Sequence, residues 1–289
     1  MRHNDEMDSV EGGLGLHARR VIAYIVLILL TILCLFWFYV LLINATRSNS
    51  ELTAGFTFIP STNLLVNITN VMHGTQPIMR GMLNSFIVAG CASILSVYFS
   101  TLTAYALHVY DFKFRNAIFT FILAVMMIPT QVTALGFIKL IDNMKLENSF
   151  IPLIIPAIAA PATFYYMKQY MESALPHAIV EAARIDGANE VRTFNTISLP
   201  MMKPAIAVQM IFTFVGNWNN YFTPALILHK EEKKTLPILI AALRSADFLK
   251  FDMGQVYVTI AFSIFPVIIV YLCLSRFIVG GVALGSVKG

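Results

Sequence analysis

The residue types that could carry out chemistry are few in this chain and do not cluster. Its six histidines are scattered, and none forms an H-E-x-x-H pair or another metal-ligand group. The three cysteines, Cys34, Cys91 and Cys273, each lie inside an apolar run, which predicts small buried hydrophobic side chains rather than a zinc site or a disulfide framework. No Ser-His-Asp or Cys-His arrangement can be argued. The sequence therefore predicts no catalytic residue and no bound metal.

The segment Gly280–Lys288, GGVALGSVK, has part of the glycine spacing of a phosphate-binding loop. Such a loop needs a lysine and then a serine or threonine directly after its last glycine, because these side chains reach the nucleotide phosphates and the magnesium ion. Ser286 stands where the lysine would be, and no strand pattern precedes the segment. The sequence therefore predicts that this chain binds no nucleotide and no other cofactor.

The composition is that of a membrane protein. Hydrophobic residues make up 57% of the chain, charged residues only 12%, and the mean hydropathy is +0.72. A soluble domain carries about 25% charged and about 45–50% apolar residues. The net charge of +4 is too small to indicate a nucleic-acid partner.

Apolar runs set the predicted elements, because a helix needs about 20 apolar residues to cross the bilayer core. The first run, Val21–Ile43, is longer than the apolar part of a secretory signal, about 7–15 residues, and predicts a retained span. The other predicted spans are Met82–Leu107, Ala117–Ile141, Phe150–Met171, Pro204–Leu228 and Val256–Val279. The predicted fold is an all-α membrane protein with six transmembrane helices, and the predicted long polar loops are Asn44–Met79 and His229–Gln255.

The orientation and packing of these spans follow from their flanks and small residues. Arg19 and Arg20 stand directly before the first span and favour an inside N-terminus, although lysine and arginine in the other loops are nearly balanced. Six spans would return both termini to the cytoplasm. Small residues three or four apart in the second span predict close helix packing. Pro152, Pro156 and Pro161 predict a bent or broken fourth span.

One segment, EAARIDGANEVRTFNTISLP (Glu181–Pro200), combines charged residues with a glycine and a closing proline in an otherwise apolar part of the chain. Leu175-Pro176 favours a helix start, and Gly187 favours a left-handed stop. Asn189 can cap a second helix, which Pro200 and Pro204 would end. The segment therefore predicts a helix, a glycine elbow and a second helix, all too polar and too short to span and so lying at the membrane surface.

The first of these two helices carries a possible charge pair and two neighbouring alanines. Glu181 and Arg184 are three residues apart and can pair. Ala182 and Ala183 would let the backbone of another protein come close. On this pattern alone, an ordinary amphipathic loop with solvated charges is an equal alternative.

The spacing of the segment, E-A-A, three residues, G, nine residues and I-x-L-P, closely resembles the EAA loop of ABC importer membrane subunits. The resemblance implies a cytoplasmic loop whose coupling helices dock into a cleft on the ATP-hydrolysing subunit. The coupling contact would then involve eight residues of the loop. They are Glu181, Ala182, Ala183, Asp186, Gly187, Ile197, Leu199 and Pro200.

The resemblance extends over residues 15 to 289. TLTAYALHVYDFKFRN, MMIPTQVTALGFIKLI and NSFIPLIIPAIAAPATFYYMKQY look like the carbohydrate branch of that family. The ending SRFIVGGVALGSVKG is similar to the C-terminal tail of the maltose-type permease subunit, which implies that Gly285, Val287 and Lys288 contact the ATPases. The implied organisation is a cytoplasmic segment 1–20, a permease domain 21–279 with its coupling loop at about 172–203, and a cytoplasmic tail 280–289.

Polar and aromatic residues inside the predicted fifth span, FVGNWNNYFTPALI, could line the path of the solute. Polar groups at such depth usually face a cavity or the bundle interior, and aromatic faces with amides suit a sugar. The candidates are Gln131, Asn217, Trp218, Asn219, Asn220 and Tyr221. An equal alternative is that the asparagines bond across the bundle, for about 0.6 kcal/mol each. In the maltose-type relatives the longer partner holds most of the sugar.

The predicted function is that of a permease subunit, without a catalytic site of its own, in a binding-protein-dependent ABC importer of a bacterial cell membrane. Its solute would be a sugar or oligosaccharide. The implied partners are a second, different permease subunit, two ATP-binding subunits that use ATP and magnesium, an extracytoplasmic solute-binding protein and the surrounding lipid. An ABC permease for an amino acid or phosphate is the alternative. The spans are nearly free of the ionisable residues that a secondary carrier would need, and they show no clustered catalytic residues of a membrane enzyme.

Overall fold

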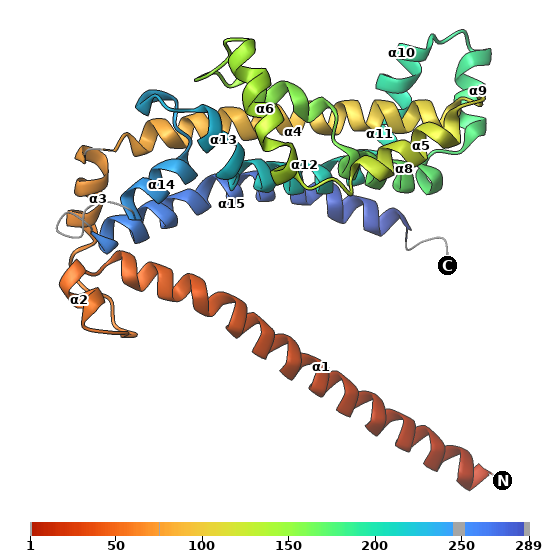
Figure 1. The fold of residues 1–289 in the computed structure, drawn as a ribbon. Coiled ribbons are helices and arrows are strands. Elements are labelled where there is room, and N and C mark those ends of the chain that lie inside the picture. The colour runs from red at the N-terminus through yellow and green to blue at the C-terminus, as the bar shows by residue number, and fades with distance from the viewer. Residues whose placement is uncertain (1, 75, 245–251, 286–289) are drawn as a thin grey trace. The chain divides into compact units, whose positions relative to one another are not determined.

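The computed structural model describes residues 2–74, 76–244 and 252–285, and these residues contain helices and no strand (Figure 1). The all-α prediction is confirmed. The α-helices are α1 (Arg2–Ala45), α2 (Asn49–Thr53), α3 (Leu64–His73), α4 (Ile78–Val109), α5 (Arg115–Val125), α6 (Thr130–Asn143), α7 (Ile151–Ile154), α8 (Pro161–Ala174), α9 (His177–Ile185), α10 (Glu190–Thr193), α11 (Leu199–Met201), α12 (Lys203–Trp218), α13 (Phe222–Ile227), α14 (Leu236–Arg244) and α15 (Met253–Gly285). The 3-10 helices are η1 (Ile155–Ile158) and η3 (Glu231–Lys233), and η2 (Phe194–Ser198) is a π-helix.

The chain forms two compact units. One contains the residues up to Asn70 together with Asp252–Ala261, and the other contains Val71–Phe251 and the residues from Phe262 onward. The loop, the helix break and the pocket that are described below all belong to the second unit.

Helices long and apolar enough to cross a membrane number four in the described residues, or six if each of two bent pairs counts as one span. The four are His17–Ala45, Ile78–Val109, Ile151–Ala174 and Met253–Ile278. The bent pairs are Arg115–Val125 with Thr130–Asn143, and Glu190–Met201 with Lys203–Trp218. The upper count agrees with the predicted six.

The predicted third span, Ala117–Ile141, is not one continuous helix. α5 ends at Val125, α6 begins at Thr130, and the two helices are bent by 94°. Pro129 caps α6 with an extended backbone. Proline has no N–H to continue a helix and pushes the preceding residue out of the helical region, so this proline explains the break.

The predicted fourth and fifth spans are interrupted as well. In the fourth, α7, η1 and α8 each hold a proline in the first turn, which confirms the expected broken element. In the fifth, α12 has 16 residues, about 24 Å of helix, which is less than the roughly 30 Å of the bilayer core. A short break at Asn219–Tyr221 separates it from α13, so the expectation of one helix over Pro204–Leu228 was wrong.

α4 is the central helix of the second unit and lies against α8 and α12. Its small residues Ala89, Ala92, Ser93 and Ala104 are fully buried, which confirms the close packing predicted from their spacing. The Ser96 hydroxyl donates to Thr163 Oγ1 of α8 at 3.3 Å. Small side chains therefore bring α8 near enough for direct polar contact.

At its first turns α4 is covered by α14, an apolar helix inside the segment expected to be a polar loop, His229–Gln255. The Leu236 backbone N–H donates to Ser85 Oγ at 2.8 Å. A Cβ on Gly81 would lie 2.3 Å from the Leu239 side chain, so only glycine admits this contact without a shift. The sequence LPILIAALR carried the signal as an apolar run too short to span, and α14 buries Leu236, Ile238 and Leu239.

The first unit is held by polar contacts around α2 and α3. Ser48 and Glu51 form a capping box at the start of α2. The backbone N–H of Ser48, with the hydroxyls of Ser61 and Ser48, holds the pKa of Glu51 below its ordinary value. Gly254 approaches the Asn67 amide so closely that a Cβ would lie 2.7 Å from it.

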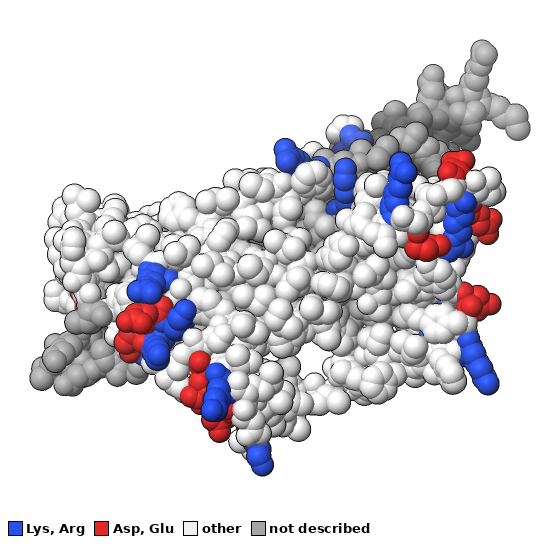
Figure 2. Space-filling view, turned by 90° about the horizontal axis from the view of Figure 1, so that it is seen from above, with Lys and Arg blue, Asp and Glu red and all other residues white. Residues whose placement is uncertain are grey.

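The surface carries charge in separate groups. On the face drawn in Figure 2, groups of lysine, arginine, aspartate and glutamate flank a broad expanse of uncharged side chains. Large apolar side chains such as Phe121 and Phe212 are 68% and 67% exposed. The expectation that the cysteines are buried was wrong, since all three are exposed. The outer face of a membrane helix is itself apolar, so an apolar run does not establish burial within the chain.

Candidate functional site

The segment that contains Glu181–Pro200 forms two short helices, α9 and α10, joined by a tight elbow at one end of α4 (Figure 1). α9 begins directly after Pro176, in agreement with the predicted helix start. Asn189 caps α10, because its side-chain oxygen accepts the Arg192 backbone N–H at 2.8 Å. From α10 the helical run continues through η2 and α11 to Met201. Pro200 therefore lies inside the run and does not end it, and the chain turns only at Met202, before α12.

The elbow is a Schellman turn centred on Gly187. Gly187 has φ +79°, and its N–H donates to the Arg184 carbonyl at 3.0 Å. The Ala188 N–H donates to the Ala183 carbonyl, also at 3.0 Å. No atom lies within 4 Å of a Cβ placed on Gly187, so the requirement for glycine comes from the backbone alone. The predicted left-handed stop is confirmed.

Apolar side chains fasten the inner side of the loop to the helices beneath it. Val180 is 1% exposed and Phe194 is 2% exposed, and both belong to a core cluster with residues of α4 and α8. The Phe194 ring packs against Tyr98 and Tyr105 of α4, with centroid distances of 5.7 and 5.4 Å. Movement of the loop must therefore displace α4 or break this cluster.

A polar cluster around Glu190 strengthens the attachment. Glu190 accepts from Arg184 Nε at 2.8 Å and from the Tyr105 hydroxyl at 3.1 Å. The Arg184 guanidinium also lies over the Tyr110 ring, 5.5 Å from its centroid. Hydrogen bonds from Tyr110 and Arg184 lower the pKa of Glu190, and the hydrogen bond to Glu190 raises the pKa of Arg184. The expected pair of Arg184 with Glu181 is therefore replaced by a contact across the elbow.

Sequence reasoning missed Tyr105, Tyr110 and Glu190 as members of this cluster. Glu190 was visible as an acid directly after the cap residue Asn189, where it favours the helix N-terminus. The two tyrosines lie about 80 residues earlier in the chain. Only the packing of α4 against the loop brings them to Glu190.

The outer side of the loop is open to solvent in this chain. Glu181, Ala182 and Asp186 are exposed, whereas Ala183 is 5% exposed and packs inward. The expectation that both alanines face another protein was therefore wrong for Ala183, because neighbouring residues on a helix point about 100° apart. The most exposed apolar side chains of the loop are Ile185 at 86% and Val191 at 73%.

The end of the motif is less accessible. Ile197 and Leu199 are half-buried, and Leu199 packs against the core cluster of α4 and α8. Pro200 is exposed. The eight predicted coupling residues therefore divide between an outer surface and an inner attachment.

The residues proposed for a solute path lie around the break between α12 and α13. Trp218 is 2% exposed and stacks on Phe214 at 5.7 Å, which places it in the packed interior of the chain. Asn217 donates to the Thr213 carbonyl at 2.8 Å. Asn220 accepts the Thr223 N–H at the start of α13, at 3.4 Å.

Asn219 and Tyr221 are exposed at the same break, and Gln131 is exposed in the first turn of α6.

The tail prediction concerns residues at the chain end. Gly285 ends α15, and Val287 and Lys288 lie outside the described residues.

The apolar spans, together with a surface loop that is fastened to the central helix, define an integral membrane protein. Residues 96–283 match the family of binding-protein-dependent transport system inner membrane components. The chain belongs to this family. It is therefore a permease component of a binding-protein-dependent importer, embedded in the inner membrane.

Known relatives match nearly the whole chain. The arabinooligosaccharides transport system permease protein of Bacillus subtilis (strain 168) is 32% identical over 276 residues, 93% of this chain and 96% of the relative. The sn-glycerol-3-phosphate transport system permease protein of Yersinia pestis bv. Antiqua (strain Antiqua) is 32% identical over 268 residues, 90% and 95% of the two chains. The fold matches a chain in the crystal structure of a bacterial ABC transporter involved in alginate import. In that match the TM-score is 0.76 at 22% identity, and 89% of this chain and 95% of that chain are covered.

Proposed function

We propose that this chain moves a sugar or oligosaccharide across the membrane and that separate subunits hydrolyse the ATP that drives the movement. The substrate class is supported by a relative whose name specifies arabinooligosaccharides, matched over 93% of this chain. The chain itself would contribute no catalytic residue, metal or cofactor, and magnesium and ATP would be used by its partners.

The observation that carries the proposal is the two-sided construction of the loop. Its inner side is tied to α4 through Phe194 and Glu190, while Ile185 and Val191 project from its outer side. We assign these two exposed apolar side chains to the surface that the partner protein covers. The outer side, with Glu181, Ala182 and Asp186, would dock on the ATPase, and the inner side would pass the resulting displacement to the spans.

This docking requires the loop and both termini to face the cytoplasm. A second permease chain and two ATP-binding subunits would complete the assembly, with a solute-binding protein on the opposite side of the membrane. The tail residues Gly285, Val287 and Lys288 would add a contact with the ATPases, as the sequence resemblance implies.

The proposed solute contacts lie at the break between α12 and α13. Irregular backbone at membrane depth is tolerated where it is buried in protein or lines a cavity. Asn219 and Tyr221 are exposed there and Gln131 is exposed in α6, so all three can meet a solute or a partner chain. Trp218 and Asn217 are engaged within the chain, and we assign them to packing and support.

Solute uptake tests the substrate class. Cells with and without this chain would be supplied with labelled oligosaccharides, sn-glycerol 3-phosphate and amino acids, because a 32% identical relative is named for sn-glycerol 3-phosphate. The proposal expects that only oligosaccharide or sugar uptake depends on the chain. Dependence of sn-glycerol 3-phosphate or amino-acid uptake alone would contradict it.

A further inference from the structure

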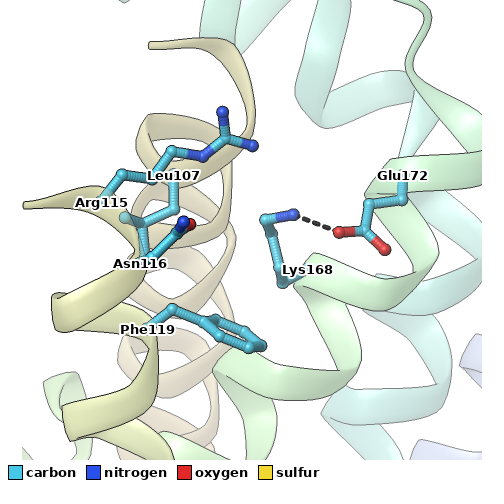
Figure 3. A pocket seen from close by; sticks show the side chains of 6 residues that line it. All are labelled: Leu107, Arg115, Asn116, Phe119, Lys168 and Glu172. Atoms are coloured by element: carbon cyan, nitrogen blue, oxygen red, sulfur yellow. Dashed lines mark hydrogen bonds and ion pairs between the residues drawn. The ribbon is translucent and has the colours of Figure 1, made fainter. Parts of the chain in front are cut away.

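A charged pocket lies where α4 ends, α5 begins and the last turns of α8 pass (Figure 3). It has a volume of about 180 Å³. Its lining residues are Leu107, Arg115, Asn116, Phe119, Lys168 and Glu172. None of them belongs to the predicted coupling surface or to the predicted solute path.

Lys168 is the most buried charged side chain of the pocket, since the residue is only 5% exposed. Its ammonium pairs with Glu172, one turn further along α8, whose side chain is 48% exposed. A buried cation needs compensation, and a lysine ammonium has three donors. Glu172 is its only acceptor among the described residues, which leaves donor capacity toward the pocket.

Arg115 and Asn116 approach from the first turn of α5. In Figure 3 both side chains extend toward Lys168 from the opposite wall. Within the described ranges neither side chain has a hydrogen-bond or ion-pair partner. No side chain caps the start of α5, so the positive end of the helix dipole adds to the positive charge of the pocket. Two cations against one carboxylate therefore favour an anionic ligand.

An apolar pocket of about 290 Å³ follows one helical turn deeper. Thr103, Ile122 and Phe164 line it, and each lies three or four residues from a residue of the charged pocket on the same helix. The Phe119 and Phe164 rings meet edge to face between the two pockets, with centroids 6.1 Å apart. A charged site above an apolar one matches a lipid headgroup above its acyl chains.

We propose that the charged pocket binds the phosphate group of an anionic membrane lipid such as phosphatidylglycerol. Arg115 would bind the phosphate through two N–H groups, Lys168 would act as a point charge, and Asn116 would donate a hydrogen bond. The acyl chains would follow the apolar pocket toward the membrane centre. Basic pockets between spans bind such headgroups at the cytoplasmic face, where the proposed orientation of this chain places the site.

The test is lipid retention by the purified membrane complex that contains the full chain, measured by native mass spectrometry at graded phosphatidylglycerol or phosphatidylcholine. The native complex is expected to retain phosphatidylglycerol preferentially. Arg115→Gln should weaken this binding about tenfold, the factor that corresponds to about 1.4 kcal/mol. Glu172→Gln should strengthen it, because the negative charge that competes with the phosphate for Lys168 would be removed. Both substitutions are at partly exposed side chains, whereas truncation of the buried Lys168 risks misfolding.

Lys113→Gln is the matched control, since it removes the same charge from an exposed side chain two residues away and outside the pocket. Equal loss of binding in Lys113→Gln and Arg115→Gln would overturn the proposal. Displacement of the lipid by millimolar inorganic phosphate would also overturn it, because the pocket would then be a site for free phosphate and not for a lipid headgroup. Lipid retention is measured on the purified complex without transport. A failed uptake experiment would therefore contradict the proposed substrate class but not the lipid site.

Discussion

The surface loop at residues 175–202 and the helix break at residues 219–221 both interrupt the bundle, yet they are held very differently. In the loop, Val180 and Phe194 are buried, and Glu190 reaches α4 through Tyr105. At the break, Trp218 is buried but Asn219 and Tyr221 are exposed. The comparison indicates that the loop is built to move together with α4, whereas the break keeps polar side chains available to another molecule.

Truncation at the break gives the largest expected effect. Trp218→Ala should lower the free energy of unfolding by about 3 kcal/mol, the lower end of the range for loss of a buried aromatic ring. The lower end is expected because lipid is as apolar as the packed interior, so moving the ring from lipid into the interior gains little. Tyr221→Ala is the matched variant, since that side chain is exposed, and it should reduce uptake with no loss of folded protein. Thermal denaturation in detergent and solute uptake would be measured together. Equal losses of stability in both variants would contradict the distinction between support and path.

The elbow gives the next largest effect. Gly187→Val should cost about 1–2 kcal/mol in backbone strain, since valine disfavours the positive φ of this position. Because the strain falls on the proposed coupling loop, uptake should be lost while ATPase subunits still co-purify and hydrolyse ATP. Gly187→Asn is the control, since asparagine tolerates this backbone region and should keep most of the uptake. Normal uptake by the valine variant would show that the elbow is not needed for coupling.

The Glu190 cluster gives a smaller effect because its ion pair is partly exposed. Side-chain exposures of Arg184 and Glu190 are 38% and 43%, so Glu190→Gln should cost only about 0.5 kcal/mol. Hydrogen exchange of the α10 amides should accelerate while exchange in α12 stays unchanged. Lys203→Gln, an exposed substitution beyond the loop, provides the comparison variant. Unaltered exchange in Glu190→Gln would mean that the apolar core cluster, and not the Glu190 contacts, holds the loop.

Acid should loosen the loop selectively. The pKa of Glu190 is below its ordinary value of 4.5 in the folded chain, so its carboxylate contributes fully above pH 4.5. That contribution is lost as the pH falls through the lowered folded pKa. Exchange of the α10 amides, corrected for intrinsic rates, should therefore be constant from neutral pH to about 5 and rise only below 4.5. Glu190→Gln should remove the rise, and an equal rise in that variant would assign it to another group.

Local signals predicted the loop well and its attachments poorly. Pro176, Gly187 and Asn189 act on the backbone within a few residues, so their effects could be predicted from spacing. The contact of Glu190 with Tyr105 depends on the packing of α4, which no local pattern contains. The same limit applies to Ala183, whose inward direction follows only once the helix is docked.

Two other differences came from signals that were present but outweighed. Pro129 marks the break between α5 and α6, but the apolar run around it favoured one continuous span. In α14, the charges of Lys233 and Lys234 and the residues that follow Arg244 made the segment look like a polar loop, and the apolar run between them was overlooked. The total hydrophobicity of a segment predicted whether the segment belongs to the bundle, but it did not predict where a helix bends within the segment.

Accessibility of Ile185 tests the central claim, that the outer side of the loop faces the cytoplasm and receives the ATPase. Ile185→Cys would be made in a chain whose exposed Cys34, Cys91 and Cys273 are replaced by serine or alanine. A membrane-impermeant maleimide should label it in inside-out vesicles stripped of ATPase, and added ATPase should protect it. Ala183→Cys, at a buried position, should remain unlabelled in both. Labelling of Ile185→Cys in intact cells, from the outside, would contradict the account.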